Sequence, residues 1–161
     1  MLALCASWFA PVEAGQMLND PRGFHGIAWG TGLQSQPDFE IARRGEHVTE
    51  YRLKNVTPAL ADIPVDSILF SSMDDQFARV TIRYHGDNTH TRVLHYLEQQ
   101  FGPIERLPGQ MIRGLNQQYN WRGTDSEINL TYQAGTERGF IFLDSRTLVP
   151  RFNDFIADTA D

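Results

Sequence analysis

The amino-acid sequence predicts an α+β fold, a single antiparallel sheet of about six or seven strands with two helices packed on one face. Three observations carry this prediction. Ser67–Ser72 and Phe77–Tyr84 flank a short polar turn, and the second segment alternates apolar and polar residues as in a β-hairpin. Thr89–Phe101 repeats apolar residues at helical spacing. Residues 117–143 hold three further short segments that suit an antiparallel meander.

The amino-terminal part of the chain is predicted to form a strand and then a short helix. Residues 24–29 (FHGIAW) have the composition of a strand and end at a glycine-rich turn. The helix is expected over Gln36–Arg44. Ser35 and Asp38 have the spacing of a capping box, a proline falls in the first turn, and Gly45 provides the stop.

The middle of the chain supplies the two elements with the clearest periodicity. Val48–Leu53 alternates and is expected to be a strand, and residues 54–64 are expected to be a connecting loop. In the helix Thr89–Phe101, a glycine and a proline follow the last turn and end the helix. Its core-facing stripe consists of His90, Val93, Leu94, Leu97 and Phe101.

Length, charge and cysteine content limit the class of protein. The chain has 161 residues, enough for one domain, and a formal net charge of −6, which argues against general nucleic-acid binding. Its one cysteine, Cys5, excludes an intrachain disulfide framework and a cysteine-based zinc site.

Residues 1–14 (MLALCASWFAPVEA) have the pattern of a secretory signal peptide. An apolar run, Leu2–Ala10, is followed by small residues at the positions that signal peptidase prefers, with cleavage expected before Gly15. No Lys or Arg precedes this run, so the signal would be truncated at its start; a buried amino-terminal helix or strand is the alternative. The run is too short to cross a membrane. Residues 15–161 are then expected to form one exported, periplasmic domain with a loosely ordered tail from about residue 150.

One strand face offers a candidate binding surface. Arg79, Thr81 and Arg83 project from the polar side of the second hairpin strand, and the chain holds 13 Arg against one Lys. Guanidinium groups beside aromatic rings bind anions or carboxylates of a partner. The alternative is a set of solvated sheet charges. The candidate ligand or partner surface consists of Arg79, Thr81, Arg83, Arg113, Tyr119 and Trp121.

No catalytic group, metal site or cofactor is predicted. His85, His90 and His95 are spaced by five residues; this spacing places His90 and His95 on different sides of the predicted helix, and His85 lies before it. The glycines between residues 26 and 32 do not have the spacing of a phosphate-binding loop.

A Gly-Ile-x-Trp-Gly-Thr segment at Gly26–Thr31 and a helix that ends on Phe-Gly-Pro at Phe101–Pro103 give an outline that covers residues 22–148. In this outline the chain resembles an uncharacterised family of small exported proteins of Gram-negative bacteria. The resemblance rests on structural motifs and implies no activity.

The function predicted from the sequence is a non-catalytic, exported binding or protein-interaction module of the cell envelope. Its expected partner is an envelope protein or a small anionic ligand, and inhibition of a secreted enzyme is a variant of the same prediction. The alternative is a small periplasmic hydrolase that uses His25 or His85 near Trp29 and the glycine corner Gly26–Gly32. A deep pocket with a histidine bonded to a carboxylate would favour the hydrolase, and a flat sheet face would favour the binding module.

Overall fold

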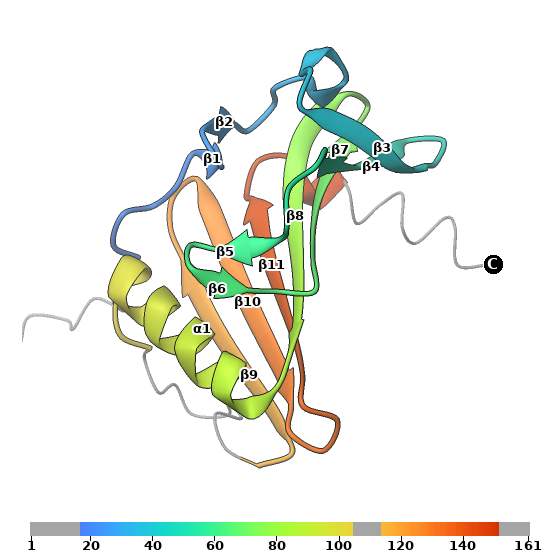
Figure 1. Ribbon diagram of the computed structural model, residues 1–161. Coiled ribbons are helices and arrows are strands. Elements are labelled where there is room, and N and C mark those ends of the chain that lie inside the picture. The colour runs from blue at the N-terminus through green and yellow to red at the C-terminus, as the bar shows by residue number, and fades with distance from the viewer. Residues whose placement is uncertain (1–16, 105–113, 152–161) are drawn as a thin grey trace, which may run out of the picture.

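The computed structural model describes residues 17–104 and 114–151, and a seven-stranded antiparallel sheet dominates this part of the chain (Figure 1). The strand order is β3-β4-β7-β8-β11-β10-β9. The strands are β3 (Phe39–Arg44), β4 (Val48–Leu53), β7 (Ser67–Met73), β8 (Gln76–His85), β9 (Asn116–Arg122), β10 (Ser126–Gln133) and β11 (Arg138–Ser145). The antiparallel sheet of the predicted α+β fold is confirmed.

Four very short strands and two helices complete the described structure. The strands form two small hairpins, β1 (Gly23–Phe24) with β2 (Ile27–Ala28) and β5 (Ala59–Leu60) with β6 (Ile63–Pro64). The helices are a single 3-10 turn, η1 (Leu33–Ser35), and one α-helix, α1 (Asp87–Phe101). Among the described residues, no helix has both the length and the apolar character needed to cross a membrane.

The β7–β8 hairpin forms as the alternation predicts. Its turn is shorter than expected, because Asp74 and Asp75 alone connect the strands, both with positive φ. Two successive left-handed residues match the twist of a two-residue hairpin turn. The register shifts between Ser71 and Ser72, so that one extra residue of β8, Ala78, bulges out of the ladder.

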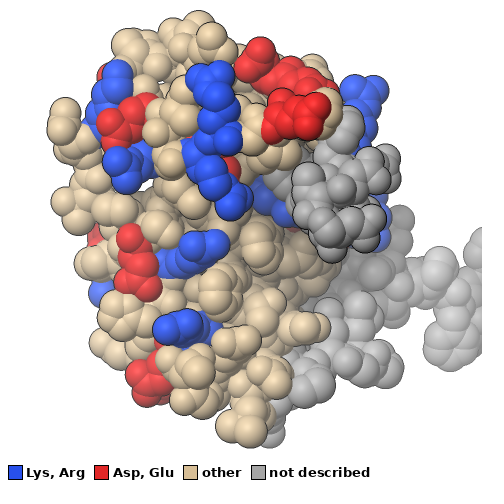
Figure 2. Space-filling model, turned by 90° about the vertical axis from the view of Figure 1, so that its right-hand side faces the viewer, with Lys and Arg blue, Asp and Glu red and all other residues tan. Residues whose placement is uncertain are grey.

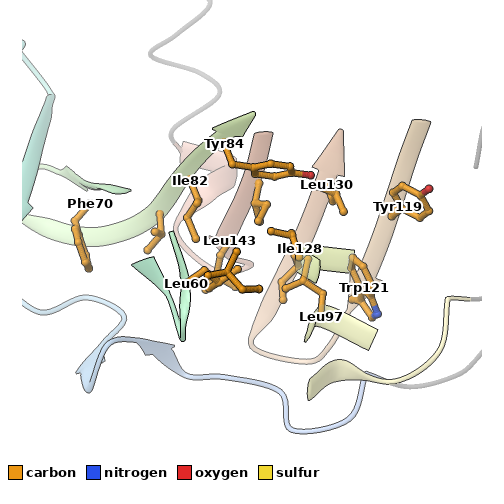
Figure 3. Packing of buried hydrophobic residues seen from close by; sticks show 14 of the residues in the cluster. Leu60, Phe70, Ile82, Tyr84, Leu97, Tyr119, Trp121, Ile128, Leu130 and Leu143 are labelled. Carbon is orange, nitrogen blue, oxygen red and sulfur yellow. The ribbon is translucent and has the colours of Figure 1, made fainter. Parts of the chain in front are cut away.

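One row of side chains carries the core across all seven strands. The register aligns them in the order Ile41, Tyr51, Phe70, Val80, Leu143, Ile128 and Trp121. All but the first, at the β3 edge, are buried. Val93 and Leu97 of α1 join the same buried cluster, so the apolar stripe of the helix lies against this face. Figure 3 shows Leu60 and Leu97 meeting the side chains of this face.

The helix predicted over Gln36–Arg44 is wrong. This segment is the edge strand β3, whose residues pair with β4 from Phe39↔Leu53 to Arg44↔Thr49. The only helical residues near it are those of η1, which end at Ser35. Phe39 is buried against Phe70, and pairing with β4 therefore overrides the local capping signals.

Several expectations from the sequence fall outside the described residues. These are the signal-like segment 1–14, almost all of the tail from about residue 150, and Arg113 of the candidate surface.

Candidate functional site

A cavity of about 750 Å³ lies between the core face of the sheet, α1 and the two small hairpins. Its deep walls are apolar side chains of the sheet and the helix, and its outer wall is made by β1 and by the segment that leads into β5. Ile68, Ile82 and Ile141 lie side by side on the sheet wall, and Leu97 and Phe101 line the cavity from α1.

The cavity lies where the sheet separates between two strands. β4 pairs with β7 only as far as Tyr51↔Phe70. Beyond that pair, Arg52 and Leu53 stay with the edge strand β3, and Ile68 on β7 has no partner on β4. The chain from residue 54 to residue 66 then crosses over the gap and returns to the sheet. The hollow is therefore a consequence of strand pairing, with apolar side chains left on both sides.

The ionisable groups of Asp, Arg and His lie at the exposed rim of this cavity, whereas the hydroxyl-bearing lining residues Ser67 and Tyr96 are partly buried. The residues that can carry charge are His25, Arg52 and Asp66, and all three are exposed. Asp66 Oδ1 lies 2.6 Å from Nδ1 of His85. Arg52 donates from Nε to Oε1 of Glu40 over 2.6 Å.

Of the two histidines named for the alternative hydrolase, His25 directly precedes the glycine corner and His85 lies far from it. Gly30 donates its backbone N–H to the carbonyl oxygen of Phe77, which fixes the corner at the first residues of β8. His85 ends the same strand, about 26 Å farther along at the usual rise per residue. Trp29 donates to Oγ of Ser126 rather than contacting a histidine. His25 lies at the cavity rim, and His85 is bonded to Asp66.

The predicted surface around Arg79 is a face of paired charges. Arg79 binds both carboxylate oxygens of Asp144, at 2.6 and 2.8 Å, and its guanidinium carbon lies 5.0 Å from the ring centre of Phe142. Thr81 is buried and Arg83 is exposed on the same face. Figure 2, seen from the side away from α1, shows acidic and basic groups interspersed. An anionic ligand at Arg79 would have to displace Asp144.

Tyr119 and Trp121 do not join that face, which corrects the candidate surface. They align with Leu130 and Ile128 on the opposite, core face, and both are buried. Trp121 donates from Nε1 to the carbonyl oxygen of Gly102 at the end of α1. Figure 3 shows both rings on the side of the sheet that holds the other core residues. Their role is to anchor the helix.

A polar network lies inside the core beside the cavity. The rings of His90 and Tyr132 are stacked at 3.7 Å, and the Tyr84 hydroxyl lies 2.8 Å from Nδ1 of His90. Nε2 of His90 lies 3.3 Å from Oε1 of Gln117, which also accepts from the Tyr119 hydroxyl. Burial lowers the pKa of His90 and raises that of Tyr84. The neutral imidazole therefore accepts from Tyr84 and donates to Gln117, and the network fixes α1 on the sheet.

The structure keeps the three candidate metal ligands apart. His90 is buried, His95 is exposed on the same helix and His85 pairs with Asp66. The described residues contain no group of three or more His, Cys, Asp or Glu side chains that could hold a metal ion.

The segment that was expected to be a plain loop supplies much of the cavity wall. Val56 to Ala61 line the outer side, while Leu60 and Ile63 are buried. The sequence of residues 57–65, TPALADIPV, is unusually apolar for a loop in water, and this composition indicates a segment that packs against the core.

Comparisons of the chain with protein-family models, with curated proteins and with solved structures gave no match.

Proposed function

We propose that this protein is a non-catalytic binding protein that holds an apolar small molecule in the cavity between the sheet and α1. The observation that carries the proposal is the cavity itself, about 750 Å³, with mainly apolar walls and its charged residues at the exposed rim. Pockets for small molecules have volumes of about 300–1,000 Å³ and combine mainly apolar walls with a few polar groups. A cavity of this size left to water would place water against Ile68, Ile82 and Leu97, which is unfavourable.

A small molecule suits the cavity better than a protein partner does. The space is lined by the sheet, by α1, by β1 and by the segment that leads into and includes β5. A protein surface would meet this outer wall, whereas a slender molecule reaches the space behind it. The proposed binding site is therefore the cavity and not the sheet face around Arg79, because Arg79 is already paired with Asp144.

The proposed setting is the periplasm. Support comes from the signal-like sequence of residues 1–14 and from the absence of any cysteine after Cys5, which suits an oxidising compartment. Mass spectrometry of the protein recovered from a periplasmic fraction should give an amino terminus at Gly15. Recovery of the protein only in the cytoplasm, with residues 1–14 intact, would contradict the proposal.

Binding of a neutral fluorescent dye, N-phenylnaphthylamine, tests the cavity directly. Ile68 lines the cavity on the core face of β7, so Ile68→Trp should fill part of it and abolish saturable binding of the dye. Ile41 belongs to the β3 edge, is 42% exposed and does not line the cavity, which makes Ile41→Trp the matched control. Thermal unfolding shows that both variants fold. Equal dye binding by both variants would contradict the proposed site.

One observation keeps a hydrolase as the second candidate. Asp66 lines the cavity and its carboxylate is bonded to His85, a pairing that can orient an imidazole as a general base. If the protein hydrolyses nitrophenyl esters and His85→Ala abolishes this activity, the hydrolase replaces the binding protein as the better proposal. We expect no hydrolysis above that of the His85→Ala variant.

A further inference from the structure

The lining of the cavity combines a largely apolar interior with a charged rim, and this division limits the class of ligand that fits. The interior walls are side chains such as Ile82, Ile141 and Leu143, whereas His25, Arg52 and Asp66 are exposed. A molecule that is polar at several places would leave polar groups unpaired inside. The ligand that fits this division is apolar along most of its length and polar at one end.

The hydrogen-bond partners of Asp66 and Arg52 indicate the charge of the ligand's polar end. Asp66 already accepts a hydrogen bond from His85 at 2.6 Å, so its carboxylate has a partner in place. Arg52 is held through Nε by Glu40, and no contact of its two terminal amino groups with another described residue is seen. Those amino groups carry four N–H donors. The Arg52 side chain keeps 61% of its surface exposed, so a ligand can reach it.

Arg52 lies beside the gap where the sheet separates, and its side chain leaves β4 on the face opposite that of Tyr51. Its neighbour Tyr51 is the last β4 residue that pairs with β7, through Phe70. Phe24, which precedes His25, lies 5.8 Å from the ring of Phe70. Arg52 and His25 therefore lie near opposite sides of Phe70, and both line the cavity.

We propose that the ligand is a single-chain amphiphile whose anionic head group binds Arg52 at the rim while its hydrocarbon chain occupies the cavity; this inference rests on the function proposed above. The head group is a carboxylate or a phosphate, because a guanidinium group matches the geometry of both. A cationic head group is disfavoured at Arg52. A neutral head group forms weaker hydrogen bonds there.

Calorimetric titration with four matched ligands tests the head group. Hexadecanoate, hexadecyl phosphate, hexadecanol and hexadecyltrimethylammonium share one chain and are used below the concentrations at which they form micelles. The two anions should bind at least about tenfold more tightly than the alcohol, because only the anions can form a charge-assisted hydrogen bond with Arg52. The tighter of the two anions distinguishes a carboxylate ligand from a phosphate ligand.

Arg52→Gln should remove the preference for anions and leave the affinity for hexadecanol unchanged. Arg43→Gln is the matched control, because Arg43 also joins a glutamate between β3 and β4, Glu50, but does not line the cavity. Hexadecanol binding as tightly as hexadecanoate, or an anion preference that survives Arg52→Gln, overturns the inference but leaves the cavity as the binding site. Failure of every ligand and of the neutral dye to bind overturns both proposals.

Discussion

The hydroxyl group of Tyr84 and Nδ1 of His90 lie 2.8 Å apart, and this contact joins the central strand β8 to the first turn of α1 within the core. Burial favours the neutral imidazole, in which Nε2 donates a hydrogen bond to Gln117 and Nδ1 accepts one from the Tyr84 hydroxyl. Burial lowers the pKa of His90 below its ordinary value of 6.5. The helix is therefore fixed on the sheet by a group that resists protonation.

The free energy of unfolding should depend on pH through His90. Its folded-state pKa lies below the unfolded value, so the unfolded chain binds a proton first as pH falls. Stability is then full above about pH 6.5 and declines below it, by at most about 1.4 kcal/mol per pH unit for one proton. Urea unfolding of the wild type and of His90→Phe between pH 5 and pH 8 measures the slope. His95→Gln, exposed on the same helix, should keep the wild-type slope, and an unchanged slope in His90→Phe would contradict the assignment.

Replacement of Gly139 should destabilise the sheet. Gly139 pairs with Tyr84, whose ring lies where a Cβ atom on residue 139 would stand. Gly139→Ala must displace this ring and its bond to His90, at a cost of about 1–3 kcal/mol. Gly135 has open space around it and no positive φ, so Gly135→Ala should change stability by less than about 0.5 kcal/mol. Equal unfolding midpoints in urea for the two variants would contradict this packing.

The Arg79–Asp144 pair should contribute to stability much more than a surface ion pair does. Its side chains are 17% and 9% exposed, so Asp144→Asn leaves a largely buried guanidinium short of its partner and should cost about 3 kcal/mol. The matched control is Arg22, 88% exposed and bonded to Asp125, where Arg22→Gln should cost less than about 1 kcal/mol. Chemical denaturation of both variants measures the loss in free energy of unfolding. Similar losses for Asp144→Asn and Arg22→Gln would contradict the burial of the Arg79–Asp144 pair.

Asp75→Gly should stabilise the β7–β8 hairpin. Asp75 has a φ of 64°, a conformation that glycine adopts without steric cost. The substitution should raise the free energy of unfolding by about 0.5–1 kcal/mol, whereas Asp75→Ala should lower it. The measurement is the midpoint of thermal unfolding. A lower midpoint for Asp75→Gly than for Asp75→Ala would contradict the two-residue turn.

Periodicity within one segment predicted the elements that depend on local sequence. The alternation in Phe77–Tyr84 and the helical stripe of Thr89–Phe101 both correspond to real elements, as do the three strands of the carboxy-terminal meander. The helix prediction for Gln36–Arg44 was wrong because this segment pairs with β4, and the local sequence contains no information about that contact. Helix capping residues are favourable locally, but the ladder with β4 and the burial of Phe39 outweigh them.

The inward face of each strand could not be assigned from the sequence, because alternation separates two faces without saying which one is buried. Tyr119 and Trp121 alternate with polar residues as expected, and only the register with Leu130 and Ile128 places them in the core. The cavity depends on contacts still more distant in sequence, since it arises where β4 leaves β7 and the β5–β6 hairpin returns over the gap.

The outer row of the sheet determines how two copies of this protein can approach each other. The register aligns Arg43, Glu50, Ser71, Arg79, Asp144, Glu127 and Arg122 across the seven strands. The row ends in an arginine at each edge, Arg43 on β3 and Arg122 on β9. Any edge-to-edge alignment of two sheets along this row brings like charges together, and β3 also carries a register shift between Ile41 and Arg43. Charged side chains at these edge positions disfavour continuation of the sheet from one molecule into the next.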